Sequence, residues 1–243
     1  MAMNNEKIIK LQQIINDSNN IVFFGGAGVS TESNIPDFRS ADGLFHMSYQ
    51  YPPEQVVSRS FFLQYPEEFY KFYKSKMMVL DAIPNPAHIK LAELEKAGKL
   101  GAVITQNIDG LHQKAGSKNV LELHGSIWRN YCLDCNALYE PKVIKEAHGI
   151  PYCHCGGVIR PDVVLYQEGL NPSIIDQSIT AIRRADTLII GGTSLAVYPA
   201  AGFIDYFRGN HLVVINKTRL EKSVFAELNI AAPIGEVLDS LHV

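Results

Sequence analysis

The sequence lacks the long apolar runs that a membrane protein requires. Its longest runs, residues 21–24 and 188–190, have the length of a strand, whereas about 18 apolar residues are needed for a helix to span a bilayer. The polar residues 1–20 contain no apolar core of a signal peptide. We therefore expect a soluble, cytoplasmic protein that has no membrane partner.

An excess of positive charge is also absent. The chain has 22 Lys and Arg against 25 Asp and Glu, so its formal net charge is -3. Because proteins that bind nucleic acids usually carry a basic surface, we expect no direct nucleic-acid partner. The 243 residues, of which 47% are hydrophobic, suffice for one α/β core with a small insert.

Cysteine is scarce and occurs in one region only. The four cysteines form two close pairs, Cys132 with Cys135 and Cys153 with Cys155, and 17 residues separate the pairs. In a reducing compartment such clustering favours a metal site over disulfides. Four thiolates complete a tetrahedral zinc shell, so His154 is not needed as a ligand, and no position stays open for water or substrate. The pattern predicts one structural zinc ion; the alternative is four unrelated thiols.

Short buried strands alternate with amphipathic helices along the chain. Asn85 and Pro86 mark one helix start, because Asn favours the N-cap and Pro the first helical position. The alternation predicts an α/β fold with a mainly parallel, Rossmann-like sheet and helices on both faces. Strands are expected at 21–24, 102–105, 120–123, 187–190 and 212–215, and helices at 4–18, 86–98, 173–184 and 198–208.

Two segments interrupt this alternation. Residues 40–83 are rich in aromatic side chains at helical spacing, which predicts a helical insert whose aromatics suit core packing. Residues 126–165 contain the four cysteines and are expected to form a zinc-binding module. The remaining residues, 1–39, 84–125 and 166–243, then form the Rossmann-like domain.

A glycine-rich turn, residues 25–28, follows the first strand. Glycines at this place let backbone N–H groups approach a pyrophosphate. The dinucleotide fingerprint is incomplete, because Thr31 stands at the third glycine position and no acidic strand end follows about 20 residues later. This departure argues against hydride transfer, and a tight turn without a ligand remains an alternative. Two later strand ends, residues 192–194 and Asn216, can line the same crevice.

Several short motifs occur in an order typical of one protein family. They are Gly26-Ala27-Gly28-Val29-Ser30, Ile35-Pro36-Asp37-Phe38-Arg39, Thr105-Gln106-Asn107-Ile108-Asp109, Leu123-His124-Gly125, the cysteines and Gly192-Thr193-Ser194. In this series the chain resembles the sirtuins of bacterial type, the NAD-dependent protein lysine deacylases, over essentially its whole length. The resemblance implies that NAD is a co-substrate and that the acyl group of a protein lysine is transferred to ADP-ribose with release of nicotinamide.

The resemblance also implies roles for single residues. His124 matches the family's catalytic histidine, which takes a proton from a ribose hydroxyl, and a histidine pKa near 6.5 suits this task. Asn107 and Asp109 match catalytic residues of the nicotinamide pocket, whereas His112 is given a structural role. The implied cofactor-binding residues are Gly26, Ala27, Gly28, Thr31, Phe38, Arg39, Gln106, Ile108, Asp109, Gly192, Thr193, Ser194 and Asn216.

The chain departs from the family pattern at two glycine positions. Asn34 replaces one glycine, and Asn tolerates a left-handed backbone better than most residues. Gln167 replaces another, in the strip where a substrate peptide would pair as an added strand. Val164 and Tyr166 of this strip are the candidate substrate contacts, and Gln167 adds bulk beside them.

A further departure concerns the acyl group. Family members that remove succinyl or malonyl groups carry a Tyr-x-x-Arg pair, and the nearest match here is Tyr73 with Lys76. The lysine ammonium is a point charge and cannot form the bidentate hydrogen bonds that an arginine guanidinium makes to a carboxylate. We therefore expect a preference for neutral acyl groups such as acetyl.

Two other functions remain open at this point. The same activated sugar could be passed to a protein nucleophile, which would make the chain a protein ADP-ribosyltransferase. A non-enzymatic NAD sensor or zinc-ribbon binding module is the other alternative. The sequence leaves the physiological substrate proteins and the oligomeric state open.

Overall fold

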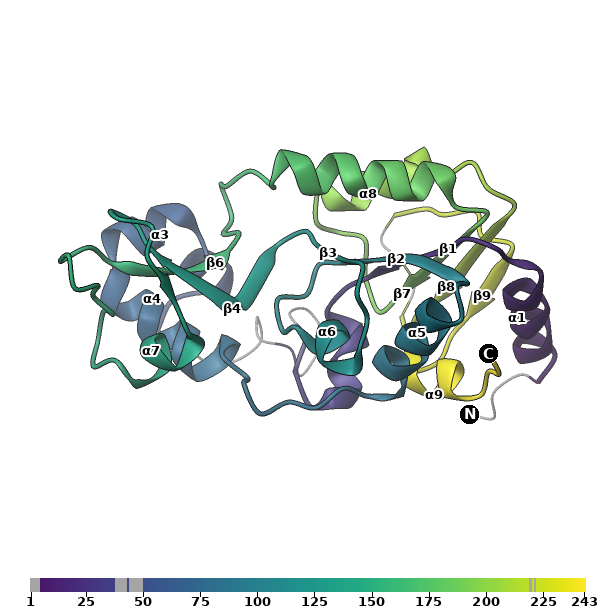
Figure 1. The fold of residues 1–243 in the computed structure, drawn as a ribbon, viewed down its shortest axis with the longest axis horizontal. Coiled ribbons are helices and arrows are strands. Elements are labelled where there is room, and N and C mark those ends of the chain that lie inside the picture. Colours follow the sequence, from purple (N-terminus) through teal and green to yellow (C-terminus); the bar gives the residue numbers. More distant parts are fainter. Residues whose placement is uncertain (1–4, 38–42, 44–49, 219, 221) are drawn as a thin grey trace.

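The computed structural model describes residues 5–37, 43, 50–218, 220 and 222–243, which form a larger and a smaller lobe side by side (Figure 1). The larger lobe contains a six-stranded sheet of order β3-β2-β1-β7-β8-β9, in which every neighbouring pair is parallel. The Rossmann-like fold class is thereby confirmed. The strands are β1 (Ile21–Gly25), β2 (Leu100–Thr105), β3 (Val120–Glu122), β7 (Thr187–Gly191), β8 (His211–Ile215) and β9 (Leu228–Ile230).

Helices cover both faces of this sheet, as the alternation predicts. One apolar core joins the sheet to α1 (Asn5–Asp17), α5 (Pro86–Lys96) and α9 (Ile234–Asp239). A second core, on the opposite face, joins it to α8 (Pro172–Arg184) and to the 3₁₀ helix η5 (Ala200–Tyr206). Figure 1 shows α8 lying along one side of the sheet, with α5 and α9 on the other.

The helix starts and ends follow local sequence rules. The Asn85 side chain accepts a hydrogen bond from the backbone N–H of Ala87 at 2.9 Å, and Pro86 is the first residue of α5, as predicted. Gly98 follows that helix with a φ of +74°, which suits its expected role at the helix end. The expected helix at 198–208 is instead the shorter 3₁₀ helix η5, and β9 and α9 were not predicted.

The smaller lobe is built from both segments that interrupt the alternation. Its antiparallel sheet has the order β5-β4-β6. Side chains of the aromatic segment, among them Phe69 and Tyr70, share one apolar core with Ile127 and Ile159 of this sheet. The Tyr70 hydroxyl donates to the Ile159 carbonyl at 2.7 Å. The elements are α2 (Pro53–Val56), α3 (Arg59–Gln64), α4 (Pro66–Phe72), the π-helix η4 (Tyr73–Met77), β4 (Gly125–Cys132), β5 (Leu138–Tyr139), α7 (Pro141–Glu146) and β6 (Ile159–Val163).

The sharing of one core has a simple cause. A three-stranded sheet buries little apolar surface alone, and packing against helices supplies the rest.

Within the described part of the chain, no helix combines the length and apolarity that a bilayer span requires.

Candidate functional site

A large cavity of about 960 Å³ lies at the carboxyl ends of the parallel strands. Ligands of open α/β sheets bind at this edge, because the loops that follow the strands converge there. The strip between β6 and α8 forms part of its wall, so both lobes contribute. Residues expected in the site that line it are Gly26, Ala27, Gly28, Thr31, Lys76, Gln106, Asn107, Ile108, Asp109, His124, Val164, Tyr166, Gly192, Thr193, Ser194 and Asn216.

The glycine-rich turn packs backbone against backbone with the end of β7. The Gly28 N–H donates to the Gly192 carbonyl at 2.8 Å, and a Cβ on Gly28 would lie 2.9 Å from the Gly192 Cα. Gly192 itself has a φ of +58°, a geometry that glycine adopts without strain. Side chains are therefore excluded from this contact, and residues 26–28 line the cavity largely with backbone, which forms a cradle that fits the pyrophosphate of a dinucleotide.

Side chains at three strand ends join this cradle. The Gln106 amide after β2 donates to the Thr193 hydroxyl at 3.1 Å, and the Asn216 amide after β8 donates to the Thr193 carbonyl at 2.9 Å. The strand ends singled out in the sequence thus meet in one crevice.

A buried polar network forms the deeper wall of the cavity. The Asn107 amide donates to the Ser30 hydroxyl at 3.0 Å, and that hydroxyl donates to Asp109 Oδ2 at 2.7 Å. The backbone N–H of Leu111 donates to Asp109 Oδ1 at 2.9 Å. Burial raises the pKa of the Asp109 carboxyl. The hydrogen bonds that it accepts from the Leu111 N–H and the Ser30 hydroxyl oppose part of that rise.

Ser30 was not among the residues singled out for the site. It is 1% exposed and connects Asn107 to Asp109. The available signal was its place at the end of the glycine-rich turn, where a hydroxyl can face the same crevice as the turn itself.

His124 lies between β3 and β4, in the segment that joins the two lobes. Its Nδ1 is 2.9 Å from the Gln106 carbonyl oxygen. Because a carbonyl only accepts, Nδ1 carries the proton of the neutral ring and Nε2 keeps its lone pair. Burial lowers the pKa of His124 and the hydrogen bond to the Gln106 carbonyl opposes this shift, so the neutral form of the ring is favoured at pH 7.

The strip after β6 is hydrogen-bonded to His124 and to the smaller lobe. The Val164 N–H donates to the His124 carbonyl at 3.0 Å, and Tyr166 exchanges backbone hydrogen bonds with Val57 and Arg59. Gln167 has a φ of +75°, in the left-handed region, and its side-chain oxygen accepts from the Ser60 N–H at 3.0 Å.

The remaining predicted site residues fall into different places. Asn34 has a φ of +61°, the left-handed geometry expected of it. Tyr73 is 0% exposed and stacks on Phe69 in the core of the smaller lobe, whereas Lys76 lines the cavity. The structure therefore does not bring the hydroxyl of Tyr73 into the cavity. Phe38 and Arg39 lie outside the described residues.

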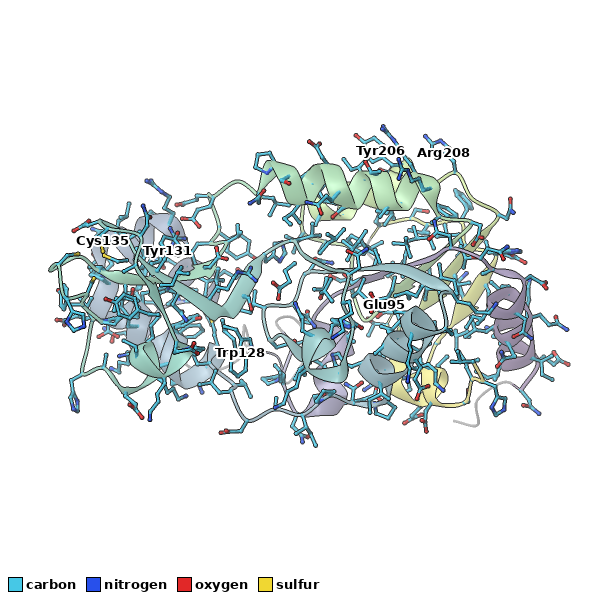
Figure 2. The ribbon with its side chains drawn as sticks, viewed as in Figure 1. Glu95, Trp128, Tyr131, Cys135, Tyr206 and Arg208 are labelled. Carbon is cyan, nitrogen blue, oxygen red and sulfur yellow. The ribbon has the colours of Figure 1, made fainter. Side chains whose placement is uncertain are left out.

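The four cysteines form one cluster in the smaller lobe. Their sulfur atoms all lie within 4.8 Å of one another, with Cys132 and Cys155 3.5 Å apart and Cys135 and Cys153 3.6 Å apart. Four thiolates about 2.3 Å from a central zinc ion would have sulfur–sulfur distances of about 3.8 Å, so the cluster fits zinc. Figure 2 shows Cys135 at the far end of the smaller lobe, and none of the four cysteines lines the cavity. The site is suited to a structural metal.

The chain is similar to proteins of one family. The model of the Sir2 family matches residues 26–199. The chain is 61% identical over 237 residues to an NAD-dependent protein deacetylase of Clostridium perfringens, covering 96% of this chain and 97% of that one. It is 43% identical over 234 residues to an NAD-dependent protein deacetylase of Staphylococcus aureus, covering 95% and 96%.

Solved structures agree in fold. A structure of Sir2 bound to acetylated peptide has a TM-score of 0.84 and 38% identity, covering 95% of each chain. A structure of Sir2 with a p53 peptide and NAD+ also has a TM-score of 0.84, with 39% identity over 94% of each chain.

Proposed function

The chain belongs to the Sir2 family, and from this premise we propose that it is an NAD-dependent protein lysine deacetylase. The overall reaction consumes an acetylated lysine, NAD and one water, and yields the free lysine, nicotinamide and an acetylated ADP-ribose. The observation that carries the proposal is the setting of His124. Its proton is held by the Gln106 carbonyl, so the ring presents a basic Nε2 in a segment that lines the cavity.

Different residues around the cavity bind the phosphate and adenosine part of NAD and its nicotinamide part. Bound NAD supplies a ribose carbon that carries nicotinamide as a leaving group. The backbone cradle at Gly28 and Gly192 holds the phosphates, and Asn216 lies beside it for the adenosine side. Asn107, Ile108 and Asp109 enclose the nicotinamide, whose carboxamide N–H groups need an acceptor such as a carboxylate. His124 takes a proton from a ribose hydroxyl and returns it.

The strip containing Val164 and Tyr166 is where the acylated lysine of a protein substrate binds. Support comes from its place on the cavity wall and from its backbone link to His124, which sets the substrate close to the base. An extended peptide can pair as an added strand with those backbone groups of the strip that are not already bonded to His124, Val57 or Arg59. We expect the protein to act in the cytoplasm, because the cysteine thiolates that would bind zinc stay reduced there.

We expect neutral acyl groups to be preferred. Lys76 lines the cavity, as does Lys217, but Tyr73 is packed in the core and cannot form the second half of an acid-binding pair with Lys76. Acetyl-lysine and succinyl-lysine versions of one peptide should differ in kcat/KM by at least about tenfold in favour of acetyl, because a carboxylate that meets only the point charge of a lysine gains less than its burial costs. A higher rate with the succinyl peptide would refute this preference.

The test of the function itself is product analysis with purified protein. NAD and an acetylated peptide should give free peptide and nicotinamide in equal amounts, together with acetylated ADP-ribose. ADP-ribose attached to protein with no lysine released would identify an ADP-ribosyltransferase. NAD binding without nicotinamide release from any acylated peptide would identify a sensor.

A further inference from the structure

The single tryptophan of the chain, Trp128, belongs to none of the three apolar cores and is 43% exposed. It is on β4, which begins directly after His124 and ends at the zinc ligand Cys132. The pairing of β4 with β6 shifts register between Ser126 and Asn130, so Trp128 lies in an irregular stretch. Such irregularities re-aim side chains near functional sites.

The indole of Trp128 is held against the loop that carries Asp109. Its Nε1–H donates to the Asp109 carbonyl at 2.7 Å. A Cβ on Gly110 would lie only 2.6 Å from Cδ1 of the indole, so the ring rests directly on the glycine backbone. Figure 2 shows Trp128 between the smaller lobe and α6 (Leu111–Ala115), which begins right after this loop.

The neighbouring residue strengthens this attachment. The Ile127 N–H donates to the Ile108 carbonyl at 2.9 Å, so two consecutive residues of β4 hold two consecutive carbonyls of the loop. The Asp109 side chain is fixed separately, by Ser30 and by the Leu111 N–H. Trp128 therefore fixes the peptide unit between Asp109 and Gly110, which adjoins the Cα that carries the Asp109 carboxylate.

We infer that Trp128 is a positioning residue that holds Asp109 and Gly110 in the orientation required for the nicotinamide end of NAD. This inference rests on the proposed function, because that function assigns nicotinamide to the Asp109 side of the cavity. It predicts a selective effect: ligands that contain nicotinamide depend on Trp128, and ADP-ribose, which lacks nicotinamide, does not.

The test is calorimetric binding of NAD and of ADP-ribose to the full zinc-loaded chain and its variants. Trp128→Phe keeps an aromatic ring and removes the N–H donor, so the Kd for NAD should rise about 3- to 10-fold. The Kd for ADP-ribose should stay unchanged, and the unfolding temperature should fall by no more than about 4 °C, as expected for one lost hydrogen bond. Trp128→His restores a ring N–H donor and should recover at least half of the lost NAD affinity on a logarithmic scale.

Tyr131→Phe is the matched control, because it removes a hydroxyl from the same strand where β4 pairs with β5 and β6. It should change neither Kd. An unchanged NAD affinity in Trp128→Phe, or equal weakening of NAD and ADP-ribose, would overturn the inference. Since binding needs no turnover, this comparison can be read even if the wild-type protein fails to release nicotinamide, a failure that would refute only the proposed function.

Discussion

Asn34 and Gln167, two residues beside the cavity, have a backbone that glycine adopts most readily. Their φ angles are +61° and +75°. A short side chain such as Asn bears this geometry at lower cost, because its amide can bond locally, whereas Gln has no such compensation. Gln167 instead gains one hydrogen bond, from the Ser60 N–H to its side-chain oxygen.

Substitution of Gln167 can separate these two effects. Both Gln167→Gly and Gln167→Ala lose the bond to Ser60, but only glycine relieves the left-handed strain. Gln167→Gly should therefore be more stable than Gln167→Ala by about 1 kcal/mol in urea unfolding, the reverse of the usual order. Equal stability of the two variants would mean that the backbone is not strained at this position.

How far single residues could be predicted depends on how local their causes are. The geometry of Asn34 followed from the residue type alone. The burial of Tyr73 did not follow from the sequence. Helical spacing shows that the aromatic side chains share one face of a helix, but it does not show which element packs against that face. Ser30 was missed because its role arises from contacts with Asn107 and Asp109, more than 70 residues away.

At the scale of elements, α5 and α6 bury a pair of histidines, His88 and His112. The rings of His88 and His112 lie 4.7 Å apart, and neither ring nitrogen of His112 has a partner among the described residues. Burial lowers the pKa of His88 to about 4. Burial, followed by the charge of His88, lowers the pKa of His112 to about 3. Both rings are therefore neutral in the folded protein.

This pair predicts acid sensitivity. Between pH 6.5 and about 4 the unfolded chain binds these protons and the folded protein does not, so stability falls as the pH falls. From pH 7.5 to 5.5 each histidine should cost about 1.4 kcal/mol of unfolding free energy. His112→Phe should lose less stability over this range than the wild type by about that amount.

Urea unfolding at the two pH values measures this difference, and His148→Gln is the control, because His148 is exposed. The control should keep the full pH dependence of the wild type. An identical pH dependence in His112→Phe and the wild type would contradict the assignment of acid sensitivity to this pair.

Elements were predictable where the sequence pattern was long. The 13-residue helices α1 and α8 and the apolar strands β1 and β7 were all expected close to their observed bounds. The six-residue helix α9 is too short to show a period, and the strand β9, with the sequence Leu-Asn-Ile, contains no apolar run. The sheet of the smaller lobe was hidden within the cysteine region, where metal ligands and turns dominate the pattern.

At the scale of the whole molecule, the zinc cluster and the aromatic helices support one another across the shared core of the smaller lobe. Cys132 and Cys153 belong to the same apolar cluster as Phe69 and Tyr70. Loss of the metal should therefore loosen α3 and α4 as well as the cysteine segment itself, even though these helices contribute no ligand.

Hydrogen exchange after zinc removal tests this coupling. With a chelator, or in Cys135→Ser, amide exchange in α3, α4, β4 and β6 should accelerate at least about tenfold, whereas the buried strands β1 and β7 keep their protection. Acceleration confined to residues 132–155 would show that the helices are independent of the zinc cluster. Arg208→Ala, in a loop of the larger lobe shown in Figure 2, is a control that should change neither region.

The arrangement of the two lobes could be predicted only in part. The alternation of strands and helices gave the larger lobe, because each unit packs on its sequence neighbours. The packing of the aromatic segment onto the cysteine segment joins parts of the chain more than 50 residues apart, as the Tyr70 to Ile159 bond shows. No local pattern encodes such a contact.

The central claim is that His124 is the base of an NAD-dependent deacetylation, and the most direct measurement compares turnover with binding in His124→Ala. Deacetylation of an acetylated peptide should fall at least about 100-fold, as is typical when a general base is lost. The calorimetric Kd for NAD should stay within about threefold, because the phosphate cradle is made by backbone groups elsewhere. A variant that binds NAD and still deacetylates the peptide at a rate near that of the wild type would contradict the account.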